Sequence, residues 1–170
     1  FGFSVGGRET RSRMGLATVL RYERDHLGVH HKERKGGDDG YQCLAEGSGA
    51  MGLLWIRRSL EFQCGLYSGL IGGCEPREAA LKAYRDTLRP YHGQVLRRFY
   101  TIFLSTKMPS RHDMLAHLAN NDDDVIVLSA NEQDKIVLED LRRLTEVWYP
   151  LLGEWKMTFK NLGLDDESHA

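Results

Sequence analysis

The sequence has few cysteines, almost no net charge and no long apolar segment. Its three cysteines, Cys43, Cys64 and Cys74, form no C-x-x-C pair. An odd number of cysteines without a secretory signal is typical of reduced thiols in the cytosol. The formal net charge of −1 gives no overall attraction to nucleic acid. No apolar run reaches the roughly 20 residues that span a bilayer. We therefore expect a globular, cytoplasmic chain that binds no nucleic acid and contacts membranes only locally.

The motifs of common enzymes and metal sites are also missing. We find no G-x-x-x-x-G-K-[ST], G-x-G-x-x-G, H-E-x-x-H or G-x-S-x-G. His30 and His31 lie in a charged loop without spaced partners for a metal. No pairing of a nucleophile with a base stands out. The sequence therefore predicts a protein that is not an enzyme and that needs neither a cofactor nor a metal.

Helical periodicity dominates the residues that are present, and we expect one all-α domain over residues 1–170 with about six helices. The expected helices cover 14–27, 52–71, 77–104, 111–119, a segment starting at the Ser129-x-x-Glu132 capping box, and 151–161. Pro90 should kink or split the third helix, and Pro150 should end the fifth. We expect an irregular start over 1–13, a Gly-rich loop over 28–49, an acidic loop at 120–124 and a polar tail over 165–170.

The segment 52–71 carries apolar residues around more than half of its helical circumference. One stripe contains Leu53, Ile56, Leu60, Cys64, Tyr67 and Ile71, and the other contains Met51, Trp55, Phe62, Leu66 and Leu70. A surface helix needs an apolar stripe of only about 100°. This helix should therefore lie between two layers or border a cavity. Within it, Gly65 and Gly69 would permit close helix packing.

His92 lies within the apolar stripe of the segment 77–104. The stripe is Leu81, Tyr84, Leu88, His92, Val95, Phe99 and Ile102. A buried imidazole needs a hydrogen-bond partner, because an unmade bond costs roughly 1–3 kcal/mol. One interpretation is a core histidine bonded to a backbone carbonyl or to a tyrosine. The other is a ligand-binding histidine.

Trp55 and Arg58 are the second unusual feature, three residues apart on one face. An indole can stack on the apolar face of a sugar, and a guanidinium can donate to hydroxyls, phosphate or carboxylate. The alternative is a core tryptophan with Arg58 extending to solvent. Taken together, Trp55, Arg58 and His92 indicate a pocket for an amphipathic ligand. Candidates for its hydrocarbon sleeve, taken from the helical pattern, are Phe62, Leu66, Val95, Phe99 and Phe103.

Four segments resemble the glycolipid transfer protein family in the same order. GLLWIRRSLEF (52–62) and AYRDTLRPYHGQVLRRF (83–99) are the more specific pair, and VLRYERDHLG (19–28) and MPSRHDMLAHL (108–118) are weaker. The resemblance spans about residues 16–164 and implies a two-layer helical sandwich that transfers glycosphingolipids between membranes. It implies that Trp55 stacks on the first sugar and that His92 bonds the ceramide amide. It also implies that Met51, Tyr84 and Leu88 line the adjoining part of the pocket.

The chain departs from the family pattern at its start and after His92. The family's early Asp-x-x-x-Asn-x-x-Lys helix has no counterpart, and residues 6–11 stand in its place. We therefore expect the N-terminal helices of the fold to be missing or truncated. The family's docking tryptophan after His-Gly is Gln94 here. A lipid sensor or a helical interaction module without transfer activity is therefore an alternative function.

The head group leaves a further alternative. The ceramide-1-phosphate branch of the family typically has arginine at the position of Trp55, so the resemblance favours a sugar. A ceramide-1-phosphate carrier using Arg57 or Arg58 is the alternative. We expect a monomer that docks transiently on membranes, through the turn with Pro109 and Arg111 or through WKMTFK (155–160).

Overall fold

The computed structural model describes residues 15–27, 32–33, 42–119 and 129–165. Our expectations for residues 1–13, the acidic loop at 120–124 and the tail after residue 165 fall outside this part. The described residues form six α-helices, α1 (Leu16–Tyr22), α2 (Gly49–Ile71), α3 (Pro76–Asp86), α4 (Gln94–Lys107), α5 (Arg111–Ala119) and α6 (Ala130–Asn161). A π-helical segment, Glu23–Leu27, extends α1, and a 3₁₀ turn, Arg89–Tyr91, separates α3 from α4. The all-α prediction is thus confirmed.

A short antiparallel ladder interrupts the segment that we expected to be a loop. Strand β1 (Lys32–Glu33) pairs with β2 (Gln42–Cys43), with Lys32 opposite Cys43. The ladder is only two residue pairs long, and the helices determine the architecture.

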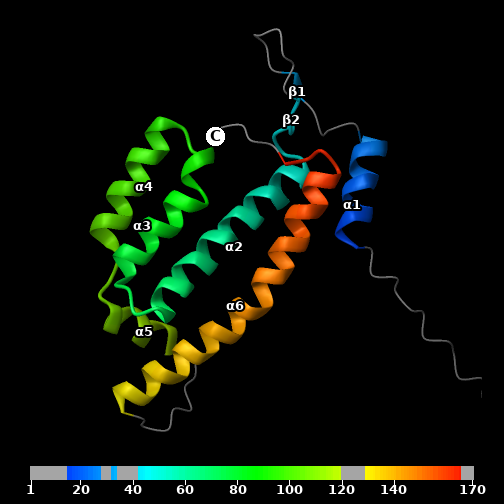
Figure 1. The fold of residues 1–170 in the computed structure, drawn as a ribbon. Helices are drawn as coiled ribbons and strands as arrows, with labels where there is room; N and C mark the ends of the chain where they lie inside the picture. Colours follow the sequence, from blue (N-terminus) through cyan, green and yellow to red (C-terminus); the bar gives the residue numbers. More distant parts are fainter. Residues whose placement is uncertain (1–14, 28–31, 34–41, 120–128, 166–170) are drawn as a thin grey trace, which may run out of the picture.

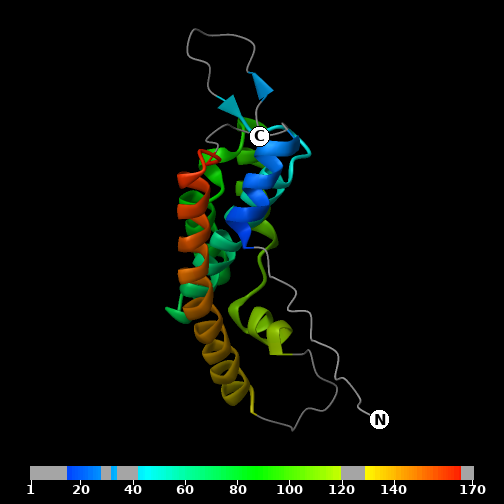
Figure 2. The ribbon, with the colours of Figure 1, turned by 90° about the vertical axis from the view of Figure 1, so that its right-hand side faces the viewer.

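Helix α2 occupies the middle of the molecule. α3 and α6 lie on either side of it (Figure 1), and both pack extensively against it. α4 packs on α3, and α5 packs on α6. In Figure 2, α5 lies away from the C-terminal half of α6, which is drawn in orange and red. The apolar pattern around most of α2 correctly predicted a helix with neighbours on two sides.

Two buried apolar clusters hold these helices together. The first cluster joins α2, α3, α4, α5 and α6 through Leu66, Leu70, Ala79, Ala80, Ala83, Tyr84, Leu88, Leu104, Leu115, Val137 and Leu141. The second cluster joins α1, the start of α2 and the end of α6 through Leu20, Leu44, Ala50, Leu54, Phe159 and Leu164. One end of α2 therefore contributes to each cluster.

The two ends of α2 are set by local chemistry. The Ser48 hydroxyl accepts the Met51 N–H at 3.1 Å, which is a standard N-cap. The Glu23 carboxylate accepts a second bond, from the Ala50 N–H at 2.9 Å, and so ties α1 to the start of α2. At the other end, Gly73 takes a φ of 87° in the turn that leads to α3.

Gly65 and Gly69 let α3 approach α2 closely, as their spacing predicted. A Cβ atom added to Gly69 would lie 2.5 Å from Ala79 Cβ, and one added to Gly65 would lie 2.9 Å from Ala83 Cβ. Both separations are too short for real carbon atoms. The absence of side chains here fixes the α2–α3 crossing.

Helix α6 continues through Pro150, so the prediction that a helix ends there was wrong. Pro150 and Glu146 are both exposed, so water can satisfy the Glu146 carbonyl that proline leaves without an N–H partner. Buried residues lie on both sides of the proline, Thr145 and Leu152, so the helix packs inward before and after it. The Ser129–Glu132 capping box that starts α6 is confirmed.

The chain splits near Pro90 as predicted, but the apolar stripe does not continue across the break. His92 is extended, with φ −88° and ψ 137°, so α4 begins with a new helical phase. The inward face of α4 carries Tyr100 and Leu104, whereas Val95, Phe99 and Ile102 are exposed. Among the described residues, no helix is both long and apolar enough to cross a membrane.

Candidate functional site

The antiparallel packing of α2 and α3 brings Trp55 and His92 together. α3 returns along α2, so the turn after α3 reaches the N-terminal half of α2 (Figure 1). The rings of Trp55 and His92 are stacked, with centroids 5.8 Å apart and an interplanar angle of 28°. Trp55 is half-buried and His92 is 6% exposed. The two residues singled out in the sequence therefore lie side by side on two elements.

His92 is held by tyrosines. Its Nδ1 and the Tyr84 hydroxyl are hydrogen-bonded at 3.2 Å, and its ring centroid lies 4.9 Å from that of Tyr100. Tyr84 and Tyr100 in turn stack at 5.5 Å. Burial lowers the pKa of His92 below its usual value, and the positive charges of Arg97 and Arg58 lower it further. The imidazole is therefore neutral at pH 7 and can both donate and accept a hydrogen bond.

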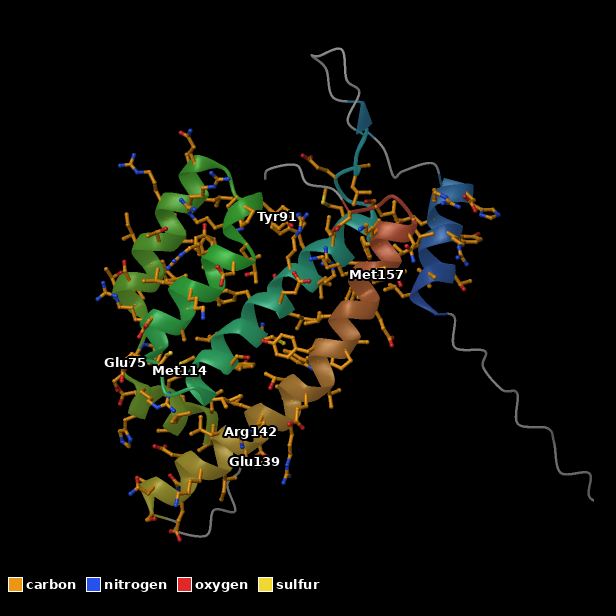
Figure 3. All side chains as sticks on the ribbon, viewed as in Figure 1. Glu75, Tyr91, Met114, Glu139, Arg142 and Met157 are labelled. Carbon is orange, nitrogen blue, oxygen red and sulfur yellow. The ribbon has the colours of Figure 1, made fainter. Side chains whose placement is uncertain are left out.

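Arg58 is buried against aromatic rings, so the alternative in which it extends to solvent is wrong. Its guanidinium carbon lies 3.4 Å from the Tyr91 ring centroid and 5.1 Å from that of Trp55. The residue is only 2% exposed. Tyr91 lies at the α3–α4 turn, on the side that faces α2 (Figure 3). Flat guanidinium groups stack well on such faces, so Arg58 joins α2 to this turn.

Arg57 faces the other way, toward the second cluster. Its guanidinium donates to Glu61 at 2.8 Å and to Asp165 at 2.7 Å, and it lies 6.0 Å from the Phe159 ring centroid. It is also 2% exposed. Two carboxylates of the protein itself therefore neutralise this charge. The two consecutive arginines therefore contact different elements around α2.

The other predicted pocket residues divide between the clusters. Tyr84 and Leu88 are buried in the first cluster, and Trp55 packs against that cluster. Met51 packs against the second cluster, and it precedes Trp55 by one turn of α2.

The five residues predicted as a hydrocarbon sleeve do not form one lining among the described residues. Phe62 and Leu66 lie on α2 at the first cluster. Val95, Phe99 and Phe103 lie on the outward face of α4, and Val95 is 82% exposed. The prediction placed them inside because it carried one helical phase through Pro90, and the turn at residues 89–93 resets that phase.

A groove of about 770 Å³ lies elsewhere, between α2, α3 and α6. Small residues of α2 and α3 form its floor, including Gly65, Gly69 and Ala79, and its walls carry both acidic and basic side chains. None of the predicted site residues lines it. In the part of the chain that the structure describes, no group of three or more His, Cys, Asp or Glu is placed to hold a metal ion.

The two segments proposed for membrane docking are tied inward. The Arg111 guanidinium donates to the Cys74 carbonyl at 2.9 Å, which anchors α5 to the α2–α3 turn. Phe159 is fully buried and Trp155 is half-buried, both in or against the second cluster. Lys156, Met157 and Lys160 of the same segment remain exposed.

Four residues that contribute to the site or its supports were not singled out in the sequence. Tyr91 directly precedes His92 in the PYHG segment, and this position next to a candidate site residue could have identified it. Tyr100 and Arg97 lie on the inward side of α4, which a new helical phase starting at Gln94 would have identified. Asp165 has no sequence signal, because its partner Arg57 is 108 residues away.

Comparisons with known proteins identify the family and the fold. A sequence profile described as Glycolipid transfer protein (GLTP) matches residues 9–120. No curated protein matched the sequence.

Solved structures with the same fold share less than a fifth of their sequence with this chain. The mouse ceramide-1-phosphate transfer protein in its apo form has a TM-score of 0.68 at 18% identity, with 89% of this chain and 65% of that chain covered. A FAPP2 structure that concerns the selection of simple glycosphingolipids by the GLTP fold has a TM-score of 0.69 at 19% identity, with 91% and 65% covered.

A human ceramide-1-phosphate transfer protein bound to 12:0 ceramide-1-phosphate has a TM-score of 0.62 at 18% identity, with 94% and 69% covered. The chain therefore spans about two-thirds of the length of these proteins. Their likeness shows the two-layer all-helical fold expected from the sequence. Because the profile covers more than half of the chain, the chain belongs to the glycolipid transfer protein family.

Proposed function

We propose that this chain binds a sphingolipid without chemical change and carries it between membranes. The observation that supports this most strongly is the stacked pair of Trp55 and His92, which two different elements bring to 5.8 Å. An indole and a neutral imidazole offer a stacking face and a hydrogen-bonding group within the span of one lipid head group.

The roles of the two residues follow from their chemistry. Trp55, on the exposed side of the pair, stacks on the first sugar of the head group. The Nδ1 atom of His92 is engaged by Tyr84, so Nε2 is the atom that bonds the ceramide amide. Tyr84 fixes the imidazole in one orientation. Burial, together with the charges of Arg97 and Arg58, lowers the pKa of His92 and keeps the ring neutral.

Selectivity must arise at this polar end. Removing hydrocarbon from water stabilises by about 0.8 kcal/mol per CH₂, but a lipid that leaves a bilayer was already out of water. The hydrocarbon contribution therefore nearly cancels between bilayer and protein, and the head-group contacts decide which lipid is carried.

A sugar head group suits the site better than a phosphate. Arg57 is neutralised by Glu61 and Asp165, so it offers no charge to a ligand. Arg58 is stacked beneath Tyr91. Arg58 still lies 5.1 Å from the Trp55 ring, and two of the similar structures are ceramide-1-phosphate transfer proteins. Ceramide-1-phosphate transfer through Arg58 is therefore the second candidate.

Docking on the membrane is assigned to the outward face of α4. Its exposed apolar residues are Val95, Leu96, Phe99, Ile102 and Phe103, and the helix contains Arg97, Arg98 and Lys107 but no acidic residue. An amphipathic helix with basic flanks is suited to the interface of an anionic bilayer. This face is a third candidate beside the two segments proposed from the sequence.

A vesicle assay tests the function directly. Donor vesicles carry fluorescent galactosylceramide or fluorescent ceramide-1-phosphate, and transfer to acceptor vesicles is followed by the loss of quenching. We expect the wild-type chain to transfer galactosylceramide faster. Trp55→Ala should reduce this transfer at least tenfold, equivalent to about 1.4 kcal/mol of lost binding, and His92→Leu should weaken lipid uptake while helix content stays near normal.

Trp148→Ala provides the matched control, because Trp148 is a half-buried tryptophan of α6 that belongs to neither element of the site. It should transfer lipid like the wild type once folded. Transfer of ceramide-1-phosphate alone would favour the second candidate. Binding without transfer would indicate a lipid sensor, and binding of neither lipid would refute the proposed function.

A further inference from the structure

Arg97 contacts the turn that carries Tyr91 and His92. The guanidinium Nε donates to the Arg89 carbonyl at 3.0 Å, and Nη2 donates to the Pro90 carbonyl at 3.2 Å. These carbonyls lie in the 3₁₀ turn between α3 and α4, where a chain that leaves a helix has few backbone partners. One side chain of α4 thus bonds two successive carbonyls of the preceding turn.

We propose that Arg97 is a positioning residue for the lipid site, which orients Tyr91 and His92 without contacting the lipid. The inference rests on the proposed function and assigns to that site a supporting residue on α4. Tyr91 directly follows the carbonyls that Arg97 holds, and His92 comes next.

The turn needs such support because its own backbone bonds are few. The Tyr91 N–H donates to the Leu88 carbonyl at 3.0 Å, but the His92 N–H reaches the Arg89 carbonyl only at 3.4 Å. His92 itself is extended rather than helical. The fork of Arg97 fixes two peptide planes at once, which a single-point donor such as lysine cannot do.

Small movements of this turn would alter the whole site. Tyr91 lies 3.4 Å from Arg58, and the His92 ring contacts Trp55, Tyr84 and Tyr100. A rotation at residues 89–91 would therefore separate the stacked pair while leaving α2 and α3 in place. Such a movement changes lipid binding more than it changes overall stability.

Arg97 also acts on His92 through its charge. The charged groups that act on the His92 ring are Arg97 from α4 and Arg58 from α2, and the phenols Tyr84 and Tyr100 pack against it. Both cations disfavour the imidazolium form. The positioning effect and the charge effect can be separated with lysine, because lysine keeps the positive charge but lacks the paired guanidinium donors.

Three variants of the 170-residue chain test the inference: Arg97→Gln, Arg97→Lys and the control Arg77→Gln. Arg77 lies at the start of α3, carries the same charge and is exposed. Binding is measured with fluorescent galactosylceramide. The pKa of His92 is measured by NMR titration, and its contact with Trp55 is measured as a nuclear Overhauser effect between the two rings.

Arg97→Gln should bind galactosylceramide about tenfold more weakly, the equivalent of one charged hydrogen bond, with a raised His92 pKa and a weakened contact between the rings. Arg97→Lys should keep the low His92 pKa, weaken the ring contact and bind with intermediate affinity. Arg77→Gln should match the wild type in all three measurements.

Wild-type behaviour of Arg97→Gln in all three measurements would overturn the inference, and so would an equal loss in Arg77→Gln. If the wild-type chain bound no sphingolipid, the proposed function would fail. The ring contact and the titration would then still decide whether Arg97 positions His92. If Arg97→Gln did not fold, the ring contact in Arg97→Lys would decide the same question.

Discussion

At the scale of single residues, buried polar side chains distinguish this molecule from a plain helical bundle. His92, Arg57 and Arg58 are all almost inaccessible to solvent. Each has partners of a different kind: a tyrosine hydroxyl for His92, two carboxylates for Arg57 and aromatic faces for Arg58. A buried polar group is tolerated only when such partners exist, so these contacts fix which way each side chain points.

The lowered pKa of His92 makes stability depend on pH. In the unfolded chain this histidine titrates near 6.5, and burial lowers its pKa in the folded chain. Between the two values the unfolded state binds more protons, so the free energy of unfolding falls as the pH drops below about 6.5. We expect the midpoint of urea unfolding to be lower at pH 5.5 than at pH 7.5.

The contribution of His92 is isolated by comparison with His92→Gln. This variant should lose part of the pH dependence, because its amide does not titrate, whereas the exposed His26, His112 and His117 remain in both proteins. An identical pH dependence in the variant would show that His92 titrates normally in the folded chain.

The sequence identified Trp55 and His92 but not the environment of either arginine. An aromatic residue or a histidine at an apolar position of a helical pattern stands out from the sequence alone. Whether an arginine at such a position extends to solvent or is buried depends on what lies opposite. Tyr91 and Asp165, which decide this for Arg58 and Arg57, belong to other elements.

At the scale of elements, α2 and α3 approach each other most closely where glycines of α2 face α3. Ala79 and Ala83 of α3 occupy the space next to Gly69 and Gly65. This contact sets the direction in which α3 returns along α2, and therefore where the turn with His92 meets Trp55.

Gly69→Ala should destabilise the protein through this contact. The new Cβ would lie 2.5 Å from Ala79 Cβ, and relief of such a clash costs about 1–3 kcal/mol, which exceeds the gain in helix propensity of up to about 1 kcal/mol. Chemical denaturation measures the difference.

Gly52→Ala is the matched control in the same helix, because nothing lies within 4 Å of its added Cβ. It should stabilise by about 0.5–1 kcal/mol. The double variant Gly69→Ala/Ala79→Gly restores the space and should recover part of the loss. A neutral Gly69→Ala with no recovery in the double variant would contradict the assignment.

Helix positions were predictable to within a few residues, because apolar period, capping residues and glycine turns all act locally. The faces of the helices were less predictable. α4 turned its Val95–Phe99 side outward because an extended residue, His92, precedes it. α6 continues through Pro150 because packing on both sides of the proline outweighs the loss of one backbone hydrogen bond.

At the scale of the whole molecule, the fold class and the pairing of Trp55 with His92 followed from the sequence, whereas the exposure of Val95, Phe99 and Phe103 did not. That exposure depends on how a complete helix is rotated against its neighbours. A hydrophobic pattern indicates that a helix face is apolar, but it does not indicate whether protein or solvent lies against that face.

The exposed face of α4 predicts how the molecule meets a bilayer. Ile102→Glu places a negative charge in the middle of this face, where Ile102 is 62% exposed. We expect it to weaken binding to vesicles containing phosphatidylserine by at least tenfold, through lost apolar burial and repulsion from the anionic surface. Flotation with the vesicles measures the bound fraction.

Ile136→Glu is the control, because Ile136 is an isoleucine of α6 with a similar exposed fraction of 50%. It lies on a helix that is not assigned to docking, so it should float with vesicles as the wild type does. Equal losses in the two variants would mean that net charge, rather than the α4 face, governs the contact.

The ion pair between Arg57 and Asp165 has a consequence for the order in which the protein assembles during synthesis. Arg57 emerges from the ribosome long before Asp165, which is 108 residues later, and until then Glu61 alone can neutralise it. Enclosing a guanidinium before its second carboxylate exists is unfavourable. The beginning of α2 is therefore expected to stay hydrated through most of translation and to close only when the end of α6 arrives.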